Sequence, residues 1–209
     1  MHRLLYLLLI PIGFFVFNNF NTNKYHKTTN PDLPATIAKT ATNSLRIKAL
    51  KDPLLSFTKK NGFNSSYAFI IDMKEHSGNK RFYVYDLEKD SVLSSGLVTH
   101  GYGNNSQQAV QFSNVVGSNC SSLGHYKIGN AYNGRFGLAF KLYGLDKTNS
   151  NAISRFVVLH SHPCVPDDEV YPSKICMSQG CPTVSPAYLQ TLKNYIEQSS
   201  KPVLLYIFY

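Results

Sequence analysis

Seven short runs of aromatic and β-branched residues follow Gly62, and this pattern constrains the fold more than any other feature. Clusters of Gly, Asn and Ser separate the runs, as is typical of strands joined by turns. Hydrophobic residues make up 43% of the chain, which is enough for a packed core. We therefore predict a mainly β domain over residues 63–209. The predicted strands are Tyr67–Met73, Arg81–Leu87, Val92–His100, His125–Ile128, Leu138–Tyr143, Phe156–His160 and Val203–Tyr209.

Helices are expected at two places. Ser185 is a suitable N-cap and Pro186 suits the first helical position, so a helix over Pro186–Gln198 should lead into the last strand. Spaced apolar residues between 35 and 60 predict two short helices with a break near Asp52-Pro53. We expect residues 35–62 to form a helical extension that packs on the β domain.

The N-terminal segment has the plan of an export signal. The run Leu4–Phe17 has no charge, follows Arg3 and precedes a polar, Asn-rich stretch. It is shorter than the roughly 20 residues that usually cross a bilayer as a helix, and no small-residue cleavage site follows it, so a cleaved signal and a retained anchor both stay open. Pro11 and Gly13 disfavour a buried helix. We assign residues 1–22 to a signal sequence or membrane anchor and 23–34 to a polar linker.

The formal net charge of +9 is concentrated near that segment. Residues 1–62 carry nine basic and two acidic side chains, so the remaining domain is close to neutral. A nucleic-acid-binding protein needs its positive charge on the folded surface that contacts phosphates. We therefore expect no nucleic-acid partner, and we interpret the basic N-terminal part as lying next to a membrane.

Reactive side chains are concentrated between residues 160 and 181. Crowded His and Cys residues suggest zinc ligands, although the chain has no Cys-x-x-Cys pair. Cys181 can instead be a nucleophile, because Gly180 lets a substrate carbonyl approach the backbone, whose N–H groups can form an oxyanion hole. His160 is its natural partner, since a nearby His makes a thiolate accessible at neutral pH. The candidates for the zinc alternative are His160, His162, Cys164, Cys176 and Cys181.

These residues resemble the signature of the murein L,D-transpeptidases. In that family a His followed by Gly or Ser precedes a Ser-His-Gly-Cys motif. Here His160-Ser161 and Ser178-Gln179-Gly180-Cys181-Pro182 are similar to it, most closely to the branch with Ser-x-Gly-Cys-Pro. The resemblance extends from about Ile70 to Val184. Its further parts, in order, are Arg81–Leu87, Val98–Gly101, Phe112–Asn114, Ser121–Tyr126, Tyr132–Leu138, Gly144–Asp146, Asn151 and Arg155.

The resemblance implies a bacterial envelope enzyme with an L,D-transpeptidase-like β-sandwich, short N-terminal helices and one helix after the catalytic Cys. It implies peptidoglycan stem peptides as substrates, and no cofactor. Carried over to this chain, Cys181 is the nucleophile, His160 is the general base, the Ser161 carbonyl orients the imidazole, and the Gly180 and Cys181 amides stabilise the oxyanion. The reaction would release D-Ala, form a thioester on Cys181 and transfer the acyl group to an amine of a second stem peptide.

Two positions depart from the family pattern. Gln179 replaces the motif His, and Thr183 stands where many members carry Arg or Asn. We therefore expect the donor carboxylate to be bound in a different way. The residues assigned to substrate binding are Ser178, Gln179, His162, Thr183 and Arg155, with Lys174 and Arg135 as further sources of positive charge.

Other functions stay open on the sequence alone. Water could resolve the thioester in place of an amine, which would make the chain an L,D-carboxypeptidase or endopeptidase using the same Cys-His pair. A zinc peptidase and a non-catalytic cell-wall-binding module are further alternatives. We expect an exported monomer in the periplasm or cell envelope, with its N-terminal segment at the inner membrane and no metal.

Export to an oxidising compartment permits disulfides. With Cys181 kept as the nucleophile, Cys164 and Cys176 are the pair we expect to be bridged, because both lie between His160 and Cys181. Two unpaired loop thiols are the alternative, since cysteines close in sequence need not have Cα atoms near enough to bridge. Cys120 is expected to be an unreactive loop residue.

Overall fold

The computed structural model describes residues 45–103 and 110–209. The predicted signal or anchor (residues 1–22) and the predicted linker (23–34) lie outside these ranges. Residues 35–44 of the predicted helical extension also lie outside them. Within the described ranges, no helix is long and apolar enough to cross a membrane. The elements are α2 (Lys51–Asn61), β1 (Tyr67–Asp72), β2 (Phe82–Asp86), β3 (Ser91–Gly96), β4 (Gly124–Gly134), β5 (Gly137–Gly144), β6 (Val158–Ser161), β7 (Thr183–Val184), α3 (Pro186–Gln198) and β8 (Leu204–Phe208).

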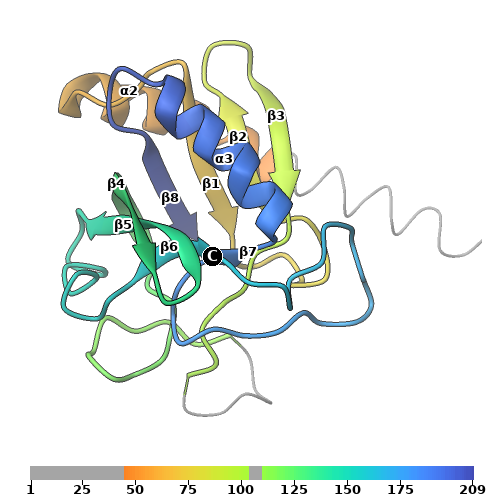
Figure 1. The fold of residues 1–209 in the computed structure, drawn as a ribbon. Coiled ribbons are helices and arrows are strands. Elements are labelled where there is room, and N and C mark those ends of the chain that lie inside the picture. The colour runs from red at the N-terminus through yellow and green to blue at the C-terminus, as the bar shows by residue number, and fades with distance from the viewer. Residues whose placement is uncertain (1–44, 104–109) are drawn as a thin grey trace, which may run out of the picture.

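The strands form one eight-stranded sheet in the order β3-β2-β1-β8-β4-β5-β6-β7 (Figure 1). Strand β8 joins the two halves of the sheet, because it pairs in parallel with β1 and antiparallel with β4. Strands β6 and β7 are also parallel, and they form the far edge. The predicted mainly β class is therefore confirmed, and the strands of the expected sandwich belong to a single hydrogen-bonded sheet.

Hydrophobic clusters cover both faces of the half that contains β1. Alternate residues of a strand point to opposite faces. Phe69 thus packs in a cluster with Leu192 of α3, whereas Ile70 packs in another with Leu54 of α2. Figure 1 shows α3 in front of β1 and β2. The α3 cluster also contains Phe140 of β5, so the two halves of the sheet share one core.

The predicted helices are found with one correction. Helix α3 has the predicted bounds, and the Ser185 side chain accepts a hydrogen bond from the Tyr188 N–H, as an N-cap does. Two helical segments separated by a break are present, as predicted, but the break lies just before Asp52-Pro53 instead of at it. Residues 45–48 are helical, a turn follows at 49–50, and α2 contains Pro53. Proline fits there because N–H groups of the first helical turn have no partner inside the helix.

Strands β5, β6 and β7 place His160. Its backbone neighbours are Ala139 of β5 on one side and Thr183 of β7 on the other. Because β7 begins two residues after Cys181, this pairing holds the loop that carries Cys181 next to the His160 strand. The β4–β5 hairpin closes with Gly134 opposite Gly137, so Arg135 and Phe136 form its tip.

Candidate active site

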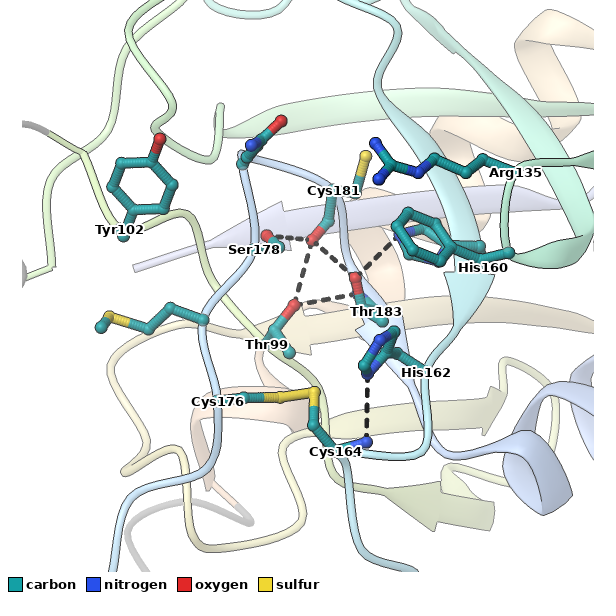
Figure 2. Close-up of a pocket in the computed structure, with 13 residues that line it drawn as sticks. Thr99, Tyr102, Arg135, His160, His162, Cys164, Cys176, Ser178, Cys181 and Thr183 are labelled. Atoms are coloured by element: carbon teal, nitrogen blue, oxygen red, sulfur yellow. Dashed lines mark hydrogen bonds between the residues drawn. A yellow bond between two sulfur atoms is a disulfide. The ribbon is translucent and has the colours of Figure 1, made fainter.

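Cys181 and His160 line one pocket of about 400 Å³ (Figure 2). The predicted substrate-binding residues Ser178, Gln179, His162 and Thr183 line it as well. Sequence reasoning missed Thr99, Tyr102, Phe136 and Met177, which come from segments outside the Cys and His motifs.

The His160 ring is held on both of its nitrogens. Nδ1 lies 3.0 Å from the Ser161 carbonyl oxygen, and Nε2 lies 3.0 Å from the Thr183 hydroxyl. A carbonyl oxygen can only accept, so Nδ1 carries the hydrogen and Nε2 is the accepting nitrogen. The expected orientation of the imidazole by Ser161 is therefore present. His160 is 8% exposed, and burial lowers its pKa below 6.5.

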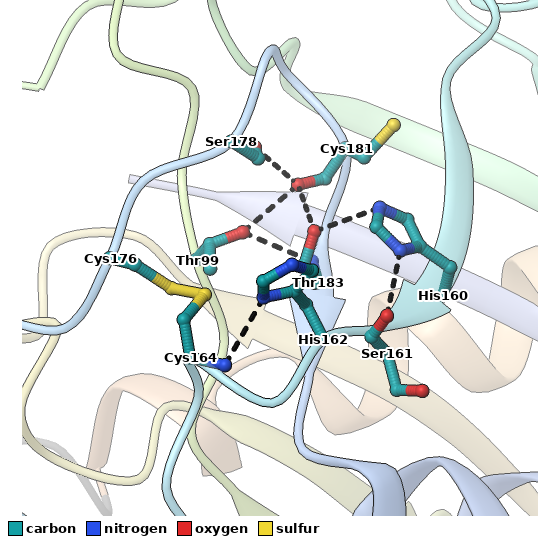
Figure 3. Close-up of a disulfide and its surroundings, with 9 residues drawn as sticks. All are labelled: Thr99, His160, Ser161, His162, Cys164, Cys176, Ser178, Cys181 and Thr183. Carbon is teal, nitrogen blue, oxygen red and sulfur yellow. Dashed lines mark hydrogen bonds between the residues drawn. A yellow bond between two sulfur atoms is a disulfide. The ribbon is translucent and has the colours of Figure 1, made fainter. Parts of the chain in front are cut away.

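Thr183 is 3% exposed, and its polar groups form hydrogen bonds with other residues of the protein. Its hydroxyl bonds to His160, and its N–H donates to the Thr99 hydroxyl over 3.1 Å. The Thr99 hydroxyl donates in turn to the Cys181 carbonyl over 3.1 Å, and the Ser178 hydroxyl donates to the same carbonyl over 2.6 Å. Three hydroxyl side chains thus hold the backbone around Cys181 and the ring of His160 (Figure 3).

The Cys181 thiol has backbone neighbours of its own. The Val158 N–H donates to Sγ over 3.4 Å, and the thiol donates to the Phe156 carbonyl over 3.6 Å. Phe156 has a φ of 55°, outside the strand region, which is why β6 begins at Val158 instead of at the predicted Phe156. Burial raises the pKa of Cys181 above 9.0, although the Val158 N–H and the charge of Arg155 oppose that shift.

Position 180 requires glycine because of its backbone conformation and because of the atoms that surround it. Its φ is 114°, and a Cβ at this position would lie 2.7 Å from the Cys120 carbonyl oxygen. Its N–H donates to the Ser178 hydroxyl over 3.1 Å. The Gly180 amide therefore already has an acceptor inside the loop, unlike the free oxyanion donor that the sequence predicts.

Arg155, which the sequence predicts to bind substrate, does not belong to the described lining of the pocket. Its guanidinium donates to the Ser113 carbonyl over 2.8 Å, to the Ser122 hydroxyl over 3.1 Å and to the Cys120 carbonyl. These contacts tie the loop that carries Cys120 against Gly180. Arg155 stabilises the wall behind the Cys181 loop, and both of its terminal guanidinium nitrogens donate there.

Cys164 and Cys176 form the expected disulfide, with Cα atoms 6.1 Å apart. Both residues line the pocket, next to His162, whose Nδ1 accepts a hydrogen bond from the Cys164 N–H over 3.1 Å (Figure 3). Two of the five candidate zinc ligands are therefore covalently joined to each other. Cys120 and Cys181 are free, and Cys120 is buried.

The tip of the β4–β5 hairpin covers the two histidines. The Phe136 ring stacks on His160, with centroids 5.2 Å apart and planes 15° apart, and it meets His162 edge-on at 5.5 Å. The Arg135 guanidinium lies 5.4 Å from the centroid of the Phe136 ring. Arg135, which the sequence suggested only as one of several cations, thus lines the pocket. An aromatic residue in a turn flanked by glycines is the sequence feature that could have indicated an exposed aromatic tip; here the turn is Gly134-Arg135-Phe136-Gly137.

His100 lies outside the described lining of the pocket and supports the loop from behind. Its Nδ1 is 2.9 Å from the buried Arg81 guanidinium, and its carbonyl accepts from the Ser178 N–H over 2.9 Å. Burial lowers the pKa of His100 to about 4, so the ring is neutral at pH 7. Within the described residues, no group of three or more His, Cys, Asp or Glu side chains is placed to hold a metal ion.

Comparison with known families gives a match over most of the chain. Residues 41–208 match the model of the family YkuD_2, described as the L,D-transpeptidase catalytic domain. No curated protein matches the chain.

Several solved structures are similar at low identity. The Ldtfm–avibactam carbamoyl enzyme is 13% identical with a TM-score of 0.42, over 69% of this chain and 49% of that one. The L,D-transpeptidase from Mycobacterium smegmatis is 13% identical with a TM-score of 0.40, over 69% of this chain and 59% of that one. The helical cell shape determining protein Pgp2 from Campylobacter jejuni is 18% identical with a TM-score of 0.42, over 75% of this chain and 54% of that one. This chain thus matches between 49% and 59% of the length of each.

Proposed function

This chain belongs to the L,D-transpeptidase catalytic-domain family, and from that premise we propose that it is a peptidoglycan L,D-transpeptidase with Cys181 as nucleophile and His160 as general base. One observation carries the proposal. The two side chains line the same pocket, and the Ser161 carbonyl fixes the His160 tautomer whose Nε2 can accept a proton. Cysteine acyl transfer needs this pair of groups.

The first half of the reaction forms a thioester. His160 Nε2 takes the thiol proton while Sγ attacks the carbonyl carbon of the amide between the third stem residue and D-Ala. The Cys181 N–H stabilises the oxyanion, because the Gly180 N–H already donates to Ser178. The C–N bond then breaks, the imidazolium returns its proton to the D-Ala nitrogen, and the acyl group stays on Sγ.

The second half restores the thiol. An amine of a second stem peptide attacks the thioester carbon, and His160 Nε2 takes one of the amine protons. The C–S bond breaks, Sγ leaves as the thiolate and is protonated by the imidazolium. The product is a new amide cross-link between the two stem peptides.

The side chains of Cys181 and Thr183 must rearrange before the first step can occur, because no hydrogen bond joins Sγ to His160 among the described contacts. In this structure the thiol donates to the Phe156 carbonyl, and the Thr183 hydroxyl is bonded to Nε2. The Cys181 side chain has to turn from the Phe156 carbonyl toward Nε2, and the Thr183 hydroxyl has an alternative acceptor in the Cys181 carbonyl, 3.5 Å away. Such rearrangement fits the general behaviour of catalytic hydrogen bonds, which tighten only when substrate is bound.

Purified full-length protein incubated with disaccharide tetrapeptides tests the proposal. We expect release of D-Ala and formation of cross-linked dimers, measured by mass spectrometry. Cys181→Ala should abolish both products, and His160→Gln should slow them by about 10²–10⁴-fold, the usual value of general-base assistance. Tripeptides without dimers would identify water as the acceptor. Full turnover by Cys181→Ala would refute the assignment of the nucleophile.

The proposed substrate also sets the location of the protein. Peptidoglycan lies in the cell envelope, so the domain of residues 63–209 must act there. We propose that residues 1–22 direct export or anchor the chain at the membrane, that 23–34 are a linker and 35–62 an extension of the catalytic domain, and that the protein acts as a monomer.

A further inference from the structure

We propose that Arg135, at the tip of the β4–β5 hairpin, binds a carboxylate of the donor stem peptide and so selects for acidic donors. The inference rests on the proposed function, and it assigns a role for which the motif residues around Cys181 provide no cation. Thr183 stands at the motif position where many members carry Arg or Asn, and its hydroxyl is bonded to His160.

The charge of the pocket favours an anionic ligand. Among the described residues that line it, Arg135 carries the only permanent charge, and none is Asp or Glu. The whole hairpin from Gly124 to Gly144 contains no acidic residue. None of the ion pairs formed by described residues includes Arg135. Its guanidinium therefore has no carboxylate partner in the described protein and can take one from a ligand.

The hairpin fixes Arg135 relative to the reactive pair. Strand pairing continues to the last residues before the turn, and the Phe136 ring is stacked on the His160 ring. Arg135 in turn lies over the Phe136 ring. Figure 2 shows the Arg135 side chain extending from the hairpin toward Cys181, above His160. A carboxylate bound by Arg135 would thus place the neighbouring part of a peptide over the thiol.

The other two candidate cations, Arg155 and Lys174, do not line the described pocket. Arg155 donates to the carbonyls and hydroxyls of the 113–122 loop. Lys174 is exposed and does not belong to the described lining of the pocket. An arginine fork can also donate two parallel hydrogen bonds to the two oxygens of one carboxylate, a planar geometry that a lysine ammonium does not match. A stem-peptide donor offers two such groups, the terminal D-Ala carboxylate and the free carboxylate of a diaminopimelate residue.

Kinetics with free and amidated donors test the proposal on the full-length protein. Arg135→Gln should raise KM for the acidic donor by about 10- to 100-fold, the effect expected from losing a hydrogen bond between charged groups, with a smaller change in kcat. Arg135→Lys should give an intermediate KM. Lys141→Gln is the matched control, because Lys141 is an exposed cation of the same hairpin that stacks on Tyr132 outside the described pocket lining, and it should behave as the unmodified protein does.

The amidated donors identify the carboxylate. Amidation of the group that Arg135 contacts should abolish the difference between the unmodified protein and Arg135→Gln, whereas amidation of the other group should preserve it. An Arg135→Gln variant with unchanged KM for the acidic donor, or with the same loss for every donor, overturns the proposal.

Alkylation of Cys181 gives a readout that needs no turnover. Iodoacetate carries a carboxylate and iodoacetamide does not. Arg135→Gln should lower the ratio of the iodoacetate to the iodoacetamide rate by about tenfold and leave the iodoacetamide rate unchanged. A lowered ratio in a protein that never turns over stem peptides would retain Arg135 as an anion site and refute the proposed function. Turnover with an unchanged ratio and an unchanged KM would refute the role of Arg135 and retain the proposed function.

Discussion

Burial acts in opposite directions on the two residues proposed to react. A buried thiol resists ionisation, so the pKa of Cys181 rises above 9.0, and a buried imidazole resists protonation, so the pKa of His160 falls below 6.5. Between these two values both groups are neutral. The pair therefore rests as thiol and imidazole, and the thiolate forms only when His160 removes the proton during attack.

This neutral pair has a measurable pH dependence. Alkylation of Cys181 by iodoacetamide should rise with pH and reach its midpoint above 9.0, because the reactive thiolate appears only there. The acidic limb of kcat/KM should have its midpoint below 6.5, since His160 stays an unprotonated base to a lower pH than usual. Site-resolved mass spectrometry separates Cys181 from the buried Cys120. An alkylation rate that is already maximal at pH 7 would indicate a thiolate–imidazolium pair instead.

Alanine substitutions at Gly180 and Gly62 distinguish a steric effect from a backbone conformational effect. Both have positive φ, but a Cβ on Gly180 would meet the Cys120 carbonyl oxygen at 2.7 Å, whereas Gly62 has no heavy atom within 4 Å. Gly180→Ala should lower the free energy of unfolding by about 2–4 kcal/mol and slow Cys181 alkylation. Gly62→Ala should cost about 1 kcal/mol and leave alkylation unchanged. Equal losses in denaturant titrations would show that the close approach at Gly180 has no effect.

Among the elements, the short parallel pair β6 and β7 and the β4–β5 hairpin build the pocket. Strand β7 is only two residues long, yet its pairing with β6 sets Thr183 beside His160. The hairpin adds Phe136 on the open face of the same ring. The disulfide between Cys164 and Cys176 closes the wall on the side of His162.

The disulfide should contribute to stability through its loop. It closes 12 positions, and loop-closure entropy of this size is worth about 3 kcal/mol in the simple chain model. Cys164→Ser and Cys176→Ser should each lose that amount in denaturant titrations, and the double variant should lose no more, because one bond is removed in every case. Non-reducing alkylation of the unfolded protein should label two cysteines, Cys120 and Cys181. Labelling of all four would contradict the bridge.

At the scale of the whole molecule, the accuracy of the predicted strands does not follow their length. The 11-residue strand β4 extends to Gly134, six residues beyond the predicted end at Ile128, and β3 ends at Gly96 instead of the predicted His100. Strands β1, β2, β5 and β8 lie within one residue of the predicted bounds at each end, because turn residues limit their apolar runs. Strand β7 is too short to show any period, and it was missed. The predicted run at Phe156 begins too early, since the positive φ of that residue leaves no mark in an otherwise apolar stretch.

The residues of the candidate site divide into those that local motifs indicate and those that tertiary contacts bring in. Cys181, His160 and Ser161 could be predicted because local motifs carry them. Arg135 and Phe136 could not be placed, because strand pairing brings the hairpin tip onto His160 from a separate part of the chain. The sequence shows the charge of Arg155 without its partners, the carbonyls of Ser113 and Cys120, so it could not indicate that the guanidinium is bonded within the protein. The burial of Thr183 likewise depends on tertiary packing.

A thioester on Cys181 is the intermediate that distinguishes the proposed reaction, and the intact mass of the acyl-enzyme reports on it. Full-length protein is mixed with a disaccharide tetrapeptide donor without added acceptor, stopped in acid and weighed. We predict a mass increase equal to the donor minus D-Ala, located on the peptide that contains Cys181, absent from Cys181→Ala and removed by hydroxylamine. An adduct of that mass that persists in Cys181→Ala, or D-Ala release from the Cys181→Ala protein, would show that Cys181 is not the nucleophile.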